Sequence, residues 1–248
     1  MRRVFVPADS LQGDLVRLSG PEAHYVQHVL RLRSGDRFGA VLPGGVERVA
    51  TVQRLGEATV EATLGEELAP DADPRADLRL RPALVKARKL DLVVQKCTEL
   101  GVSEIAPVLC DRSVARPDRE GAAHKLERWE RIALEAARQC GRRSPPRIVA
   151  PVAFEAALGE VRDLGGTGLI LAPEATEGIG PGRAILGAAD AEPISLLVGP
   201  EGGFSEDEVR AATESGLRPV SLGRRVLRAE TAAIAICALL TYELGELS

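Results

Sequence analysis

Two segments in which a strand runs into a glycine-containing loop, both in the C-terminal third of the chain, hold the residues best suited to chemistry. The first is Gly199-Pro200-Glu201-Gly202-Gly203, directly after an apolar run, and the second is Leu222–Arg228, which leads into Glu230. Glycine takes backbone angles that other residues avoid, so a ligand can approach the chain closely at such loops. Arginine and glutamate residues stand beside these loops, at the rim of the expected site. The two segments therefore predict one binding and catalytic site.

Several other kinds of site are excluded by their missing motifs. No Gly-Lys-Ser/Thr ending follows the glycines, the Gly-x-Gly-x-x-Gly fingerprint is missing, and no Gly-x-Ser-x-Gly elbow is present. The three histidines and four cysteines form no cluster with the spacing of a metal site. The sequence therefore argues against a P-loop nucleotidase, a Rossmann dinucleotide enzyme, a serine hydrolase and a structural zinc site.

The composition is that of a folded protein with local basic clusters. The chain has 248 residues, of which 45% are hydrophobic, and a net charge of −4. It shows no signal-peptide or membrane-spanning run, and the unpaired cysteine pattern suggests reduced thiols, so we expect a cytoplasmic protein. Two arginine groups stand out: Arg138, Arg142, Arg143 and Arg147, and Arg218, Arg224, Arg225 and Arg228. Each could bind phosphate or be ordinary solvated charge.

The elements that must position the loops change character along the chain. The first seventy residues predict short strands around one helix, Pro21–Arg31, and therefore a small barrel; Val46–Leu55 and Ala58–Leu64 are expected to form a hairpin about Gly56. Residues 69–75 are polar and proline-bearing, which is typical of a linker. Strands and helices then alternate, which indicates an α/β fold with a mostly parallel sheet. The predicted strands of this part are Leu78–Val85, Glu104–Leu109, Arg147–Ala150, Gly168–Ala172, Ile194–Val198 and Pro219–Leu222.

Three helices of the second part carry distinct signals. Ser205 and Glu208 form the pattern of a capping box at the start of a helix. Lys125–Cys140 predicts a long helix that buries one stripe, Cys140 included. The last helix, Thr231–Leu244, is apolar nearly all round, so it must be covered by the fold or by another subunit. We expect Ile236 to lie on the face that a second copy would bury.

Four motifs in order resemble a known family. They are Tyr25–Arg31, Gln95–Val102, Ala137–Arg142, and the pair Leu197–Phe204 with Leu222–Ala232. Together they resemble the knotted SPOUT-type methyltransferases, and among these the ribosomal RNA small-subunit methyltransferase E family, which methylates a uridine at ring N3. The resemblance covers the chain. It implies a PUA-like β-barrel over residues 1–72, which would bind RNA, and a SPOUT trefoil-knot domain over residues 73–248.

The resemblance also implies the cofactor, S-adenosylmethionine, and agrees with the glycine loops on where it would bind. A third wall would come from Leu171–Glu174, at the end of another strand. The residues expected to bind the cofactor are Leu171, Pro173, Glu174, Gly199, Pro200, Glu201, Gly202, Leu222, Gly223, Val226, Leu227, Thr231 and Ala232. Backbone groups of the glycine loops would form most of this cradle.

Methylation of a uridine nitrogen requires removal of the imide proton and stabilisation of the resulting anion. Arg228 is the candidate for the anion, and Glu230 for the proton. Both could instead be structural, with Glu230 as an acidic residue that favours the helix N-terminus. The residues expected to contact RNA are His28, Arg31, Gln139, Arg142 and Arg143. The expected partners are small-subunit ribosomal RNA, in the assembled subunit, and a second copy of the chain, with no membrane and no metal.

Two other functions remain open at this point. The same pocket could serve ribose 2′-O methylation of RNA, which differs only in the acceptor. Alternatively, the chain could be a non-catalytic RNA-binding protein of ribosome assembly, with the barrel as its functional part. The second alternative leaves the glycine loop Gly199–Gly203 without a purpose, which favours an enzyme.

Overall fold

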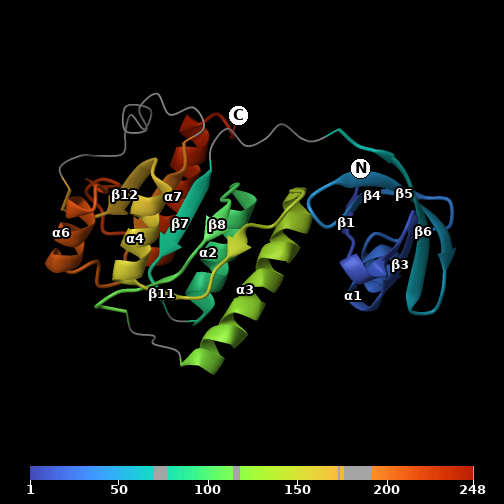
Figure 1. Cartoon of the computed structure of the whole chain (residues 1–248), viewed down its shortest axis with the longest axis horizontal. Coiled ribbons are helices and arrows are strands. Elements are labelled where there is room, and N and C mark those ends of the chain that lie inside the picture. The colour runs from blue at the N-terminus through green and yellow to red at the C-terminus, as the bar shows by residue number, and fades with distance from the viewer. Residues whose placement is uncertain (70–76, 86, 114–117, 173, 176–191, 248) are drawn as a thin grey trace. The chain divides into compact units, whose positions relative to one another are not determined.

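A computed structural model describes residues 1–69, 77–85, 87–113, 118–172, 174–175 and 192–247. Contacts divide the chain into two compact units (Figure 1). The N-terminal unit holds Met1–Asp73 together with Ala137–Ser144, and the C-terminal unit holds Pro74–Ala136 and Pro145–Ser248. The expected linker, residues 69–75, lies outside the described residues except for Ala69.

The N-terminal unit is built on a six-stranded sheet in the order β1-β4-β5-β6-β3-β2. Only β1 and β4 pair in parallel, and the other neighbours are antiparallel. The elements are β1 (Arg3–Phe5), η1 (Ala8–Ser10), β2 (Leu11–Gln12), β3 (Leu15–Ser19), α1 (Gly20–His24), the π-helical turn η2 (Tyr25–Val29), β4 (Arg37–Val41), β5 (Glu47–Leu55) and β6 (Thr59–Glu67). The predicted hairpin and the single predicted helix are therefore confirmed.

One face of this sheet makes the core of the unit. Alternate residues of β3, Val16 and Leu18, are fully buried, and Phe38 of β4 lies among them. Ala23 and Val26 of the short helical segment cover the same cluster. This is the alternation that a half-buried antiparallel sheet requires.

The C-terminal unit contains a second six-stranded sheet, in the order β10-β8-β7-β13-β12-β14, with every pair parallel. Its strands are β7 (Leu78–Pro82), β8 (Glu104–Ile105), β10 (Arg147–Ile148), β12 (Thr167–Leu171), β13 (Ile194–Val198) and β14 (Arg218–Val220). The prediction of a mostly parallel sheet is confirmed. The predicted strand Glu104–Leu109 is wrong, because β8 ends at Ile105 and β9 (Val108–Leu109) pairs with β11 (Val152–Ala153) in a separate two-stranded sheet.

Helices cover both faces of the parallel sheet. Residues of α2 (Ala87–Glu99), α3 (Arg119–Cys140) and α7 (Ala229–Glu243) pack in one apolar cluster, and residues of α4 (Phe154–Leu164) and α6 (Glu206–Glu214) pack in another. Central strands contribute to both: Leu196 of β13 joins the first cluster, and its neighbour Leu197 joins the second. A strand buried on both faces explains why Ile194–Val198 is apolar without alternation.

Helix α7 does not present Ile236 as expected. That side chain is fully buried in the apolar cluster of its own unit, beside Cys237 and Leu240. The exposed apolar residues of α7 are Leu239 and Tyr242. Ile236 is therefore internal core, because the sheet and α2 already cover that side of the helix. Cys140 was also misplaced, since it is exposed at the end of α3.

Candidate active site

Three neighbouring strands end together beneath the predicted site. β12 pairs with β13 on one side and with β14 on the other, all in parallel, so Leu171, Val198 and Val220 lie at the same edge of the sheet. The loops that follow these strands are the segments that the sequence singled out. In parallel α/β sheets, ligands bind in the crevice outside the carboxyl ends of the strands.

A small hollow of ≈ 60 Å³ lies between these strand ends and the start of α7. It is lined by Leu171, Val198, Gly199, Pro200, Gly203, Ser221, Leu222, Gly223, Arg225, Leu227, Ala229 and Ala232. Seven residues expected to bind the cofactor are among them, contributed by all three strand-end segments and by α7. We call this hollow the inner hollow. The sequence argument missed Val198, Gly203, Ser221, Arg225 and Ala229, although each adjoins a residue that it named.

Two larger spaces adjoin the inner hollow. One of ≈ 600 Å³ is lined by Leu222, Gly223, Arg224, Arg225 and Leu227, four of which also line the inner hollow. The other, of ≈ 750 Å³, shares only Gly203 with it and brings in Arg112, Glu174, Gly202, Arg210 and Arg218. A ligand seated in the inner hollow can therefore extend along the segment 222–227.

Backbone geometry explains some of the glycines and corrects the role of one. Gly203 and Gly223 have φ angles of 70° and 95°, which disfavour any other residue, and both have open space where a side chain would stand. At Gly199 an added Cβ would lie 3.1 Å from the ring of Phe204. Gly202 was expected to require unusual backbone angles, but its φ is not positive. A side chain there would instead press on Arg112, 3.3 Å away.

The loop after β13 is held from outside by a network of side chains. The predicted capping box is confirmed: the Ser205 hydroxyl accepts from the backbone N–H of Glu208, and Oε2 of Glu208 accepts from the backbone N–H of Ser205. Oε1 of Glu208 accepts from the backbone N–H of Asp111, and Nη1 of Arg112 donates to the Gly202 carbonyl at 2.7 Å. These bonds fix the loop before any ligand arrives.

A buried thiol near this network is unsuited to act as a nucleophile. Burial and the carboxylate of Glu208 raise the pKa of Cys110 to about 12. Its thiol is therefore protonated at neutral pH, and the thiolate is the reactive form. Covalent chemistry at Cys110 is disfavoured.

Two carboxylates and one lysine lie together where the loop after β13 meets the start of α2 and α7. Nζ of Lys89 is 2.8 Å from Oε1 of Glu201 and 3.5 Å from Oε2 of Glu230. Its hydrogen bond to Glu201, and the charges of both carboxylates, raise the pKa of Lys89. Arg228 is the N-cap residue of α7, its side chain makes no capping bond, and it is exposed. Both predicted catalytic residues thus border the first turn of α7, and Lys89 was missed by the sequence argument.

The remaining predicted cofactor residues do not line the inner hollow. The side chain of Val226 is 85% exposed, and Thr231 points outward from α7. Glu174 and Gly202 line the space of ≈ 750 Å³ instead. Glu201 is exposed and bonded to Lys89. Pro173 lies outside the described residues.

All five residues expected to contact RNA belong to the N-terminal unit. His28 and Arg31 are exposed, and Arg31 has a positive φ of 53°. Gln139, Arg142 and Arg143 come from the end of α3 and the turn after it; Gln139 is exposed, and the two arginines are half-buried. Burial lowers the pKa of Arg142. Sequence position alone would not place this turn with the first unit.

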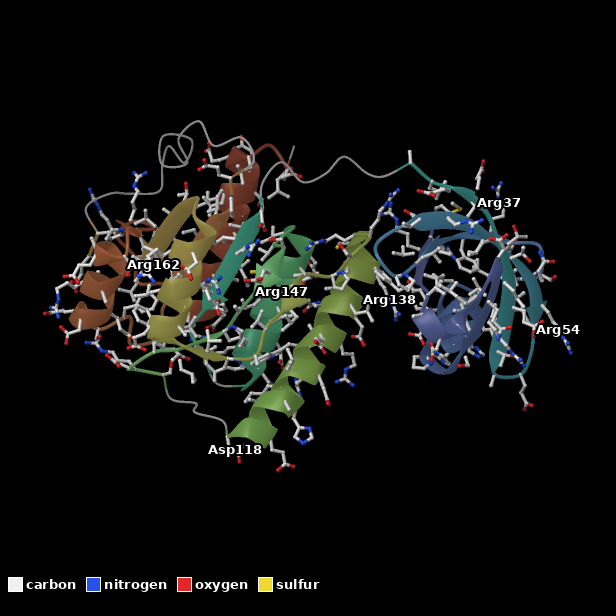
Figure 2. All side chains as sticks on the ribbon, in the orientation of Figure 1. Arg37, Arg54, Asp118, Arg138, Arg147 and Arg162 are labelled. Carbon is white, nitrogen blue, oxygen red and sulfur yellow. The ribbon has the colours of Figure 1, made fainter. Side chains whose placement is uncertain are left out.

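The arginines at the end of α3 are tied into the N-terminal unit. Arg138, labelled on α3 in Figure 2, bonds Glu22 at 3.0 Å and lies over the rings of Phe5 and Tyr25. Nε of Arg143 lies 3.0 Å from the carboxylate of Glu47, a residue that also accepts two bonds from Arg3. Glu47 is buried, so its charge depends on these partners.

Two further kinds of feature bear on the described part of the chain: clusters of metal ligands and membrane-spanning helices. Histidine, cysteine, aspartate and glutamate side chains do not gather there into any group of three or more that could hold a metal ion. Of the helices described, none combines the length and the apolar character needed to cross a membrane.

Comparison with known proteins places the chain among RNA methyltransferases. Residues 73–241 match the model of an RNA methyltransferase domain, and residues 18–64 match that of an RNA methyltransferase PUA domain. Ribosomal RNA small subunit methyltransferase E of Synechocystis sp. is 33% identical over 230 residues, which cover 93% of this chain and 74% of that protein. The Bacillus subtilis protein of the same name is 29% identical and covers 98% of this chain and 97% of its own.

Solved structures agree over the full length. Ribosomal RNA small subunit methyltransferase E from Neisseria gonorrhoeae, bound to S-adenosyl methionine, superimposes with a TM-score of 0.84 at 29% identity and covers 98% of this chain and 97% of its own. A Legionella pneumophila protein, in complex with the bound cofactor SAM, gives a TM-score of 0.85 at 31% identity and covers 97% of each chain.

Proposed function

The chain belongs to the ribosomal RNA small subunit methyltransferase E family, and on that premise we propose that it methylates ring N3 of a uridine in 16S ribosomal RNA with S-adenosylmethionine as donor. The observation that carries the proposal is the inner hollow. Three parallel strand ends and the start of α7 enclose it, and Arg228 and Glu230 stand at that same helix start. A protein that only bound RNA would have no use for such a hollow.

The inner hollow and the adjoining space of ≈ 600 Å³ together suit the cofactor, because their shared walls combine apolar side chains with accessible backbone. Gly223 leaves open space where any other residue would place a Cβ, and its positive φ keeps that space open. Leu171, Leu227 and Ala232 supply apolar surface for a purine ring. When bound, S-adenosylmethionine supplies a methyl carbon on a sulfonium sulfur, so the new N–C bond forms as the C–S bond breaks and the electron pair stays with sulfur.

The chain's own residues would prepare the acceptor. The carboxylate of Glu230 accepts the N3 proton, which leaves a uridine anion whose charge is shared with the neighbouring ring oxygens. The guanidinium group of Arg228, which is exposed at the start of α7, stabilises that charge. After transfer, Glu230 returns the proton to solvent. Positioning and electrostatics therefore supply the catalysis.

The N-terminal unit would hold the RNA, in the assembled small subunit, through His28, Arg31, Gln139, Arg142 and Arg143. We also propose a cytoplasmic homodimer. Leu239 and Tyr242 of α7 and Leu92 of α2 are exposed apolar side chains on two helices that pack together, and a second copy would bury them. Sedimentation at micromolar concentration tests this assembly: an active monomer would contradict it.

Nucleoside analysis tests the reaction. Small-subunit particles from a strain that lacks the enzyme are incubated with the chain and S-adenosylmethionine, and the RNA is digested and analysed by mass spectrometry. We expect N3-methyluridine with the wild type and at least about a hundredfold less with Glu230→Gln. Ribose-methylated nucleoside would instead indicate 2′-O transfer. Binding of RNA without binding of S-adenosylmethionine in calorimetry would indicate a non-catalytic protein.

A further inference from the structure

A lysine outside the predicted site joins three elements of the C-terminal unit. Lys89 stands in the first turn of α2, Glu201 in the loop after β13, and Glu230 in the first turn of α7. The single ammonium group of Lys89 is 2.8 Å from one carboxylate and 3.5 Å from the other. The loop that borders the inner hollow and the proposed proton acceptor are therefore tied to the same cation.

The carboxylate of Glu230 needs such a partner. Its side chain is 12% exposed, and its Oε2 is buried without accepting a hydrogen bond from any described residue. A buried anion is costly unless a cation faces it. Lys89, 35% exposed, can supply that charge while remaining hydrated itself.

We propose that Lys89 is a positioning residue for methyl transfer, which acts by holding the carboxylate of Glu230 in register with the loop after β13. This inference rests on the proposed function, in which Glu230 accepts the N3 proton. When Glu230 becomes neutral, Lys89 keeps its hydrogen bond to Glu201, so no unpaired cation is left behind. A displacement of about 1 Å between reacting groups can cost about a hundredfold in rate, which is the scale on which Lys89 would act.

The alternative is an ordinary surface ion pair, which contributes little to stability and nothing to catalysis. The chain offers a matched control. Arg128 of α3 bonds Asp91 of α2, and the bonds to Asp91 raise the pKa of this arginine as Glu201 raises that of Lys89. That pair also joins α2 to another element, but it borders none of the hollows described above.

The experiment compares full-length wild type, Lys89→Met, Lys89→Arg, Glu230→Gln, the double variant of Lys89→Met with Glu230→Gln, and Arg128→Met. Small-subunit particles and S-adenosylmethionine are the substrates, and kcat, KM and the unfolding midpoint are measured. We expect Lys89→Met to lower kcat by about 10–100-fold with KM for RNA within about twofold, and Lys89→Arg to recover most of the loss. The double variant should be no slower than Glu230→Gln alone, because both changes act through one carboxylate.

The outcomes separate this inference from the function on which it rests. Equal kcat for Lys89→Met and Arg128→Met, in an active wild type, would overturn only the role of Lys89. Losses that multiply in the double variant, or a Glu230→Gln variant as active as wild type, would also overturn it. A wild type that binds S-adenosylmethionine but methylates no small-subunit RNA would overturn the proposed function and this inference together. If Lys89→Met unfolds, Lys89→Gln provides the same comparison.

Discussion

The arginines of the two basic clusters stand in opposite surroundings. Arg138, Arg143 and Arg147 are bonded to Glu22, Glu47 and Glu104, two of them buried carboxylates. By contrast, Arg224, Arg225 and Arg228 are exposed, and they form no ion pair with any other described residue. Arginine therefore stabilises the fold at Arg138, Arg143 and Arg147 and remains available for a ligand at Arg224, Arg225 and Arg228. The carboxylate partner makes the difference, and a charge count along the sequence does not reveal it.

The largest expected difference between the two clusters is at Arg228. Replacing it with alanine should lower kcat by about 10²–10³, because one donor to the developing anion is lost. The free energy of unfolding should change by less than about 0.5 kcal/mol, since the side chain is exposed. Single-turnover kinetics and urea unfolding measure the two effects. A stability loss larger than the catalytic loss would place Arg228 with the structural arginines.

Arg143→Ala should show the reverse pattern. Removing one partner of a buried carboxylate costs about 3–5 kcal/mol, and because Arg3 still bonds Glu47 we expect about 2 kcal/mol here. Arg37→Ala is the control, since Arg37 and Glu66 are both exposed and should contribute less than about 0.5 kcal/mol. Urea unfolding measures the free energy of unfolding of the two variants. Equal stability would show that the bond to Arg143 adds nothing to the buried pair.

A glycine of each unit has a positive φ angle that would strain any other residue. Gly223 and Gly44 have φ angles of 95° and 87°, and both have open space at the Cβ position. Alanine at either position should cost about 1–2 kcal/mol. Only Gly223→Ala should also weaken S-adenosylmethionine binding, by about tenfold, as measured by calorimetry. Equal affinity of the two variants would show that the 222–227 segment is a turn without a binding role.

Arg142→Ala should give the smallest effect. Its loss should weaken RNA binding severalfold and reduce the dependence of affinity on salt by about one unit of slope. Affinity for S-adenosylmethionine should stay unchanged. Binding titrations at several salt concentrations measure the slope. If the slope is retained and stability falls instead, Arg142 belongs with Arg138 and Arg143.

Local patterns predicted the parts of the fold that depend on neighbours in sequence. The hairpin of β5 and β6, the capping box at Ser205 and the apolar strand β13 follow from periodicity and residue type. The sequence did not reveal that 137–144 joins the N-terminal unit, because the bond from Arg143 to Glu47 links distant positions and leaves no periodic signal. Ile236 was misread for a related reason: an all-round apolar helix does not say which neighbours cover it.

Parts of the candidate site could likewise be predicted from local sequence, and other parts could not. Glycine loops after strands indicated the inner hollow, since both the turn and the strand end are local features. Lys89 could not be predicted, because it reaches the site across two elements far from it in sequence. Residues that act through a partner rather than through a motif require the packed structure to be found.

The pairing of β7 with β13 also limits how early the parallel sheet can form during synthesis. Leu78 of β7 lies beside Ile194 of β13, whereas the strands of the N-terminal sheet all precede Leu68. At about 5–20 residues per second, a ribosome needs on the order of ten seconds to synthesise the intervening chain. Strand β7, with its buried Leu78 and Leu80, waits through that interval without its central neighbour, exposed to chaperones and to other nascent chains. Production of this protein is therefore limited by how well the first strand of its parallel sheet is protected until the fifth has emerged.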